Sequence, residues 1–79
     1  MDLTKEDLNF LLYLLNNLDE SSNKLTKERL RTFISQKKVE KNQFSSTIGD
    51  IYFSLLMIED TVLMSKLDSF MKNKKIKFK

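Results

Sequence analysis

The sequence predicts an all-α fold, and three observations support this prediction. The 79 residues include one glycine and no proline, the two residues that interrupt helices most strongly. Apolar residues recur at intervals of three and four, the spacing of one helical face. Polar clusters at 19–24 and 41–43 separate the periodic segments. We therefore expect a small three-helix domain over 1–72, followed by a flexible basic tail over 73–79.

The first helix is expected from about Lys5 to about Asp19. Thr4 precedes it as an N-cap, because its hydroxyl can accept a hydrogen bond from a free backbone N–H of the first turn. Asp7 stands three residues later and completes an approximate capping box. The inner face of this amphipathic helix should consist of apolar residues at helical spacing, namely Leu8, Leu11, Leu12, Leu15 and Leu18, widened by Phe10 and Leu14.

The second short amphipathic helix is expected from about Lys27 into the region 37–41. The residues from Leu25 to Leu30 repeat the pattern from Leu3 to Leu8, so Thr26 is expected to act as an N-cap in the way that Thr4 does. A leucine before each cap and another four residues after it are placed as a hydrophobic staple. The inner face of this helix should hold Leu30, Phe33 and Ile34.

The third helix is expected to be long and very apolar, from near Ser45 to Thr47 as far as about Lys72. A coiled-coil-like seam runs along it with steps of three and four, formed by Ile48, Ile51, Leu55, Ile58 and Val62. A second stripe lies beside the seam, formed by Tyr52, Leu56, Leu63, Leu67 and Phe70. A break near 59–61, which would create a fourth helix, is the alternative.

Glu59 lies among these stripes, so the pattern predicts a substantially buried carboxylate. Such a group needs a partner. An ion pair with Arg29 or Arg31 is one interpretation, and a polar register device in a helix–helix interface is the other.

A helix that is apolar on most of its circumference must be covered, and two short helices provide little cover. We therefore expect binding to a protein partner and a homodimer or higher oligomer through the third helix. Met57, Met64 and Met71 follow heptad spacing and suit either an adaptable binding surface or a core. The expected partner-binding or oligomer residues are Ile48, Ile51, Tyr52, Leu55, Ile58, Glu59, Val62 and Leu63.

The net charge of +3 is unevenly distributed, and cations gather on the second helix and in the tail. On a helical projection the second helix would carry a basic stripe that the tail could extend, formed by Lys27, Arg31, Lys38 and Lys41, with Lys74 and Lys75. Such a stripe can follow phosphates and contact nucleic acid. A solvated face of a helical bundle and docking to an acidic protein are the other interpretations. A glycine-bearing helix-turn-helix elbow is missing, and the third helix is too apolar for a major groove.

The inventory of reactive residues argues against an enzyme and against a cofactor. The sequence contains no His, no Cys and no glycine-rich phosphate loop, so the usual zinc sites and disulfides are excluded. The polar connection after the first helix resembles an EF-hand loop, because Asp19, Ser21 and Asn23 alternate. It departs from that pattern where Lys24 replaces the required glycine and Leu30 the bidentate glutamate. No metal site is expected.

The acidic N-terminal segment is unlike a signal peptide, and no apolar run approaches the ~20 residues of a membrane span, so a cytoplasmic protein is expected. The leading hypothesis is a small regulatory or inhibitory protein that binds a protein partner, and a phage- or plasmid-encoded protein would fit it. A nucleic-acid-binding regulator is the alternative. In its outline of short amphipathic helices with a basic tail, the chain is also similar to bacteriocin immunity proteins of Gram-positive bacteria, although those are usually longer and no diagnostic motif is present. This resemblance implies a helical immunity protein as the third hypothesis.

Overall fold

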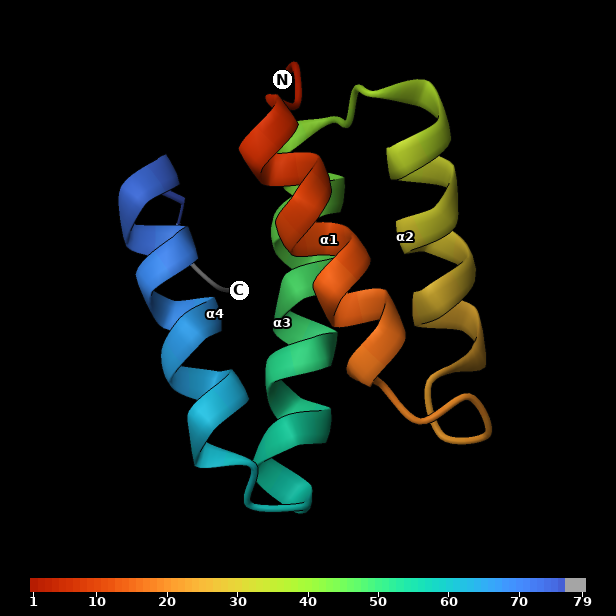
Figure 1. Cartoon of the computed structure of the whole chain (residues 1–79), viewed down its shortest axis with the longest axis vertical. Coiled ribbons are helices and arrows are strands. Elements are labelled where there is room, and N and C mark those ends of the chain that lie inside the picture. The colour runs from red at the N-terminus through yellow and green to blue at the C-terminus, as the bar shows by residue number, and fades with distance from the viewer. Residues whose placement is uncertain (77–79) are drawn as a thin grey trace. The chain divides into compact units, whose positions relative to one another are not determined.

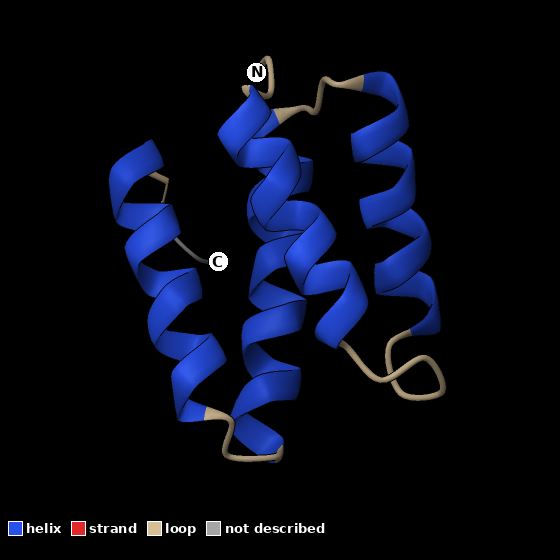
Figure 2. Ribbon diagram, in the orientation of Figure 1, coloured by secondary structure: helices blue, strands red, loops and turns tan. Residues whose placement is uncertain are grey.

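The structure is a computed structural model that describes residues 1–76, and over this range it is all-helical without a strand (Figures 1 and 2). The four helices are α1 (Lys5–Asn17), α2 (Lys24–Gln36), α3 (Lys41–Met57) and α4 (Thr61–Lys74). They form two compact units, Met1–Glu40 and Lys41–Lys79. In each unit two consecutive helices pack against each other, so we call the units the first and the second hairpin.

The all-α prediction is confirmed. A single domain over 1–72 with a flexible tail over 73–79 stays a prediction, although α4 continues to Lys74. Residues 77–79 lie outside the described part of the chain. Among the described residues, no helix combines the length and the apolar character that crossing a membrane requires.

The start of α1 confirms the predicted capping box. The backbone N–H of Asp7 donates to Thr4 Oγ1 at 3.1 Å, and the backbone N–H of Thr4 donates to Asp7 Oδ2 at 2.9 Å. These bonds satisfy two of the backbone donors that every helix leaves free at its N-terminus. The helix ends at Asn17, two residues before the predicted end.

The buried face of α1 is narrower than predicted. Leu11, Leu14 and Leu18 are buried, whereas Leu12 is 42% exposed. Leu12 lies one residue, or about 100° of helical rotation, from Leu11 and therefore falls on the flank of the stripe. Its assignment to the inner face is wrong.

The predicted start of α2 is wrong, because the helix begins at Lys24 after Asn23 as its N-cap. The backbone N–H of Lys27 donates to the carbonyl of Asn23 at 2.8 Å, so the chain is already helical where Thr26 was expected to cap. Leu25 is 61% exposed, so it does not form the predicted hydrophobic staple. The second copy of the Leu-Thr-Lys-Glu pattern therefore lies inside the helix.

The first hairpin is closed by a short antiparallel bridge. α2 ends at Gln36, and Lys37 then adopts a left-handed conformation with φ of 59°. The backbone N–H of Leu3 donates to the Lys37 carbonyl at 3.1 Å, and that of Val39 donates to the Met1 carbonyl at 3.0 Å. The side chains of Leu3 and Val39 are buried.

The expected continuous third helix is wrong, and its alternative, a break into a fourth helix, is found at 58–60. The helix α3 also begins at Lys41, earlier than expected. At its end Glu59 is left-handed, with φ of 57°, and the backbone N–H of Asp60 donates to the Leu55 carbonyl at 3.1 Å. This is a Schellman motif, which stops a helix. Asp60 then starts α4 by accepting a hydrogen bond from the Leu63 N–H at 3.1 Å.

The second hairpin keeps part of the predicted seam. Phe44, Ile48, Ile51 and Leu55 of α3 are buried, and so are three residues of α4, namely Leu63, Leu67 and Met71. The rings of Phe44 and Phe70 meet edge to face, with centroids 6.1 Å apart. The seam stops at the break, where the next seam residues become exposed.

Candidate protein-binding site

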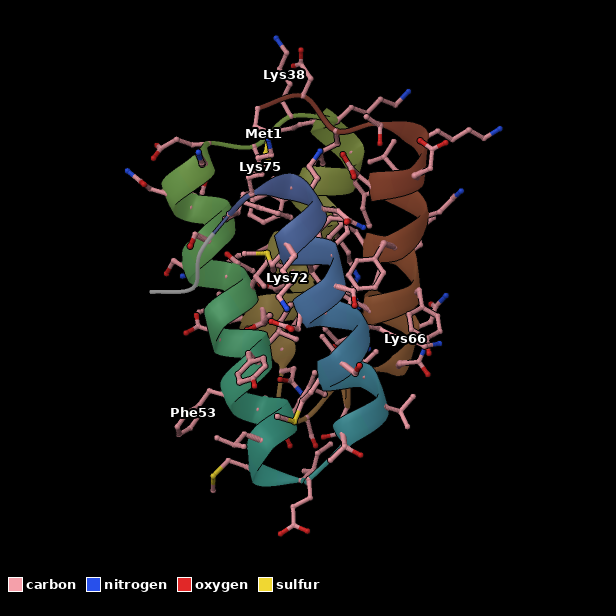
Figure 3. All side chains as sticks on the ribbon, turned by 90° about the vertical axis from the view of Figure 1, so that its left-hand side faces the viewer. Met1, Lys38, Phe53, Lys66, Lys72 and Lys75 are labelled. Atoms are coloured by element: carbon pink, nitrogen blue, oxygen red, sulfur yellow. The ribbon has the colours of Figure 1, made fainter. Side chains whose placement is uncertain are left out.

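Large apolar side chains gather in the second hairpin where α3 ends and α4 begins. Each is more than half exposed to solvent, and Phe53 projects outward from α3 in Figure 3. We call this group the apolar tip, and its exposed fractions are 64% for Phe53, 53% for Leu56, 70% for Met57, 68% for Ile58 and 65% for Val62.

The local backbone explains why these side chains stand together. Phe53, Leu56 and Met57 are related by three and four residues and therefore share one face of α3. Phe53 lies about 200° around the helix from both Ile51 and Leu55, the buried residues on either side of it. The Schellman turn then brings the chain back within three residues, so Val62 in the first turn of α4 returns beside the last turn of α3.

The size of the apolar tip distinguishes it from scattered surface residues. With about 200 Å² for a fully exposed large apolar side chain, the five exposed portions amount to roughly 600 Å². The largest apolar patch on a typical monomer is about 300–600 Å² and is often functional. The apolar tip lies at the upper end of that range.

The turn at the apolar tip carries only acidic charges. Glu59 is exposed and Asp60 is half-buried within the turn itself. Residues 51–65 contain no lysine or arginine, and the next cation is Lys66, one helical turn after Val62 on α4. The tip therefore combines apolar side chains with two carboxylates.

Only part of the predicted partner-binding surface lies in the apolar tip. Ile58 and Val62 belong to it. Tyr52 is half-buried. Four predicted residues are buried and are unavailable to a partner in this structure, namely Ile48, Ile51, Leu55 and Leu63.

Glu59 is exposed in the turn, so its predicted burial is wrong. The expectation failed because the helix ends before Glu59, which removes it from the stripes. Arg31, one of its two expected partners, pairs instead with Glu20, at 3.1 Å from Nη2 to Oε1.

Sequence reasoning missed Phe53, Leu56 and Met57 as exposed binding candidates. Met57 was noted as an adaptable side chain, and Leu56 was assigned to the second stripe. A signal for Phe53 exists, because it is offset by two residues from two members of the seam and must point away from them in a helix.

Lys27 does not belong to the predicted basic stripe. This lysine is buried, and its Nζ donates to the carbonyl oxygen of Leu18 at 2.9 Å. Leu18 is the C-cap of α1, where free carbonyls and the helix dipole favour a cation. Lys27 therefore holds the end of α1 and does not extend into solvent.

The remaining cations do not share one helix, so the predicted stripe is wrong as drawn. The projection assumed a helix as far as residue 41, but α2 ends at Gln36. Lys38 lies in the antiparallel bridge with Asp2, and Lys41 begins α3 in the other unit. Of the two tail lysines, Lys74 is the last residue of α4 and Lys75 caps it with φ of 57°. Nucleic-acid contact by these lysines stays a prediction.

The connection between α1 and α2 is a self-contained polar loop. Asp19 Oδ2 accepts hydrogen bonds from Ser21 Oγ at 2.7 Å, and from the Ser22 backbone N–H and Oγ, both at 2.9 Å. These bonds, that of Ser21 first, hold the pKa of Asp19 below its ordinary value of 3.8. Asn23 Nδ2 donates back to the Asp19 carbonyl at 3.0 Å.

Of the side chains that the EF-hand resemblance would direct at calcium, Asp19 and Ser21 are bonded to each other through Oδ2 and Oγ, and Asn23 is bonded through Nδ2 to the backbone of the loop. Across residues 1–76, no cluster of three or more side chains suited to a metal ion is found.

Comparison with known proteins adds nothing to this picture: no protein-family model, no curated protein and no solved structure matches the chain.

Proposed function

We propose that the chain is a small non-enzymatic regulatory or inhibitory protein that binds another protein through the apolar tip. One observation carries this proposal: five large apolar side chains, each more than half exposed, occur within ten residues at the end of α3 and the start of α4. A patch of this kind marks an interaction surface when it is contiguous and bordered by polar groups.

The size of the apolar tip fits a reversible complex. Burial of roughly 600 Å² of apolar surface contributes on the order of 15 kcal/mol at about 25 cal/mol per Å². Association costs about 4–15 kcal/mol in lost freedom of motion. The surplus supports moderate affinity, which suits a regulator that engages and releases its target.

A binding role is supported further by the residues that the sequence lacks. General acid–base and nucleophilic catalysis draw most often on histidine and cysteine, and the chain has neither. We infer that the consequence of binding is to occupy or reshape the partner.

The proposal is tested by affinity purification from cells of the organism that encodes the chain. Three tagged forms are compared, namely the unmodified chain, the tip variant Phe53→Ser/Met57→Ser, and Leu25→Ser as a control. Leu25 is 61% exposed in the first hairpin, so its change removes a similar apolar surface elsewhere.

A specific protein should co-purify with the unmodified chain and with the control and be lost from the tip variant. Recovery of the same proteins with all three forms would contradict the proposal. Circular dichroism of each variant checks that the helices are retained.

A further inference from the structure

The residues of the apolar tip indicate what kind of partner surface binds it. We propose that its occupant is a basic amphipathic helix of the partner protein, whose apolar stripe covers the tip and whose lysines or arginines face Glu59 and Asp60. This inference rests on the proposed function and adds the chemistry of the partner.

Charge complementarity is the first argument. The segment from Ile51 to Ser65 carries two carboxylates and no cation, and both carboxylates lie in the turn beside Ile58 and Val62. Glu59 is exposed, and Asp60 is half-buried with one carboxylate oxygen accepting the Leu63 N–H. A partner that buries the apolar side chains must place its own border against these charges, so a basic border is favoured.

The shape of the tip is the second argument. Phe53 and Met57 are one turn apart on the same face of α3, which ends at Met57, and exposed Ile58 follows in the turn, so they present a short apolar patch rather than a long seam. An amphipathic helix docks such a patch with a few anchors spaced by three, four and seven residues. The apolar stripe of such a helix can cover the roughly 600 Å² that the tip exposes. This area is smaller than the ~800 Å² that each partner contributes to a standard interface.

The same features disfavour two other occupants. A second copy placed symmetrically on the tip would bring two Glu59 and two Asp60 carboxylates together, and like charges oppose each other across an interface. An anionic membrane surface attracts basic segments and would repel the carboxylates of the tip.

The experiment is a titration of the full isotope-labelled chain, followed by NMR, with two synthetic peptides about four helical turns long. One consists of leucine and lysine in an amphipathic pattern, and the other has glutamate at every lysine position. We expect the leucine–lysine peptide to shift the amide signals of residues 53–62 and to bind at least fivefold more tightly than its acidic counterpart.

Charge reversal at one position sharpens the test. In Glu59→Lys the preference should shrink or invert, with the affinity for the basic peptide falling about two- to fivefold, as expected for an exposed charge pair. Lysine is compatible with this position, because Lys37 and Lys75 already adopt the same left-handed conformation. In Met57→Ser/Ile58→Ser both peptides should lose affinity, and in the control Leu25→Ser neither should.

Several outcomes would overturn the inference. These are equal affinity for the two peptides, an unchanged preference in Glu59→Lys, signal changes outside the tip, or no binding of either peptide. Sedimentation equilibrium showing a dimer that Met57→Ser/Ile58→Ser abolishes would assign the tip to a second copy. Co-sedimentation with vesicles of neutral and anionic phospholipid that the same variant abolishes would assign it to a membrane. Failure here would leave the proposed function standing if affinity purification still finds a tip-dependent partner.

Discussion

The connection between α1 and α2 and the connection between α3 and α4 both join packed helices, yet they face solvent with different chemistry. In the first, Asp19 collects three hydrogen bonds from Ser21 and Ser22, and Lys27 covers the end of α1. In the second, three residues turn the chain, and exposed apolar residues precede and follow two carboxylates. A loop that satisfies its own polar groups needs no partner, whereas the exposed apolar tip gains free energy when covered.

The comparison predicts its largest effects for neighbouring leucines. Leu55→Ala should lower the free energy of unfolding by about 2–5 kcal/mol, because Leu55 is buried, whereas Leu56→Ala should change it by less than about 0.5 kcal/mol. In the first hairpin, Leu11→Ala should likewise lower the free energy of unfolding more than Leu12→Ala, because Leu11 is buried and Leu12 is exposed. Urea denaturation measures all four. Equal losses at Leu55 and Leu56 would show that the apolar tip is part of the core.

The second effect concerns the cation that closes the first hairpin. Lys27→Met keeps the length of the side chain and removes the charged donor to the Leu18 carbonyl, so stability should fall by about 1–3 kcal/mol. Lys24→Met, at an exposed position of the same helix, is the control and should change stability by less than about 0.5 kcal/mol. Thermal melts measure both variants, and an equal change in Tm would contradict the capping role of Lys27.

These outcomes depend on features that the sequence revealed only in part. The capping box at Thr4 followed from local chemistry. The spacing placed Ile48, Ile51 and Leu55 on one helical face, but that face was assigned to a partner and is buried within the chain. The break at 58–60 was harder to predict, because Ile58 and Val62 continue the spacing of three and four across it. A left-handed residue that is not glycine leaves no mark in the sequence, although Asp60 followed by an apolar run is an N-cap signal.

The candidate site was harder to predict from the sequence than the fold. Burial of Glu59 was inferred from a helix that does not continue through it. Lys27 was placed on a basic stripe, although it stands three residues before Leu30 and therefore shares the inner face of α2. The error in the boundary of α3 changed the surface assigned to Glu59, and Phe53, Leu56 and Met57 were recognised as exposed only in the structure.

A smaller effect of opposite sign is expected where helices end on a left-handed residue. Lys37→Gly should stabilise the first hairpin by about 0.5–1 kcal/mol, because glycine adopts φ of 59° without the steric cost of a side chain. In the second hairpin Lys75→Gly should act alike. The control is Lys38→Gly in the antiparallel bridge, which should give no gain. Urea denaturation that shows no difference between Lys37→Gly and Lys38→Gly would contradict this account.

The smallest effect is a pH dependence of the polar loop. The pKa of Asp19 is lowered in the folded chain, so its contribution to stability is present above the ordinary value of 3.8 and is lost as the pH falls through the lowered pKa. A carbon-13 NMR titration of the carboxyl group should give a midpoint below 3.8, and Ser21→Ala/Ser22→Ala should move it upward. An unchanged midpoint in that variant would show that the serines do not cause the shift.

The most direct test of the apolar tip as a protein-binding surface is site-specific photocrosslinking in cells of the organism that encodes the chain. A benzophenone amino acid replaces Met57 in one form and Leu25 in another, two side chains that are 70% and 61% exposed in different hairpins. Our account predicts a discrete adduct with one other protein from position 57 and none from position 25. The absence of an adduct at position 57, or the same adducts from both positions, would contradict it.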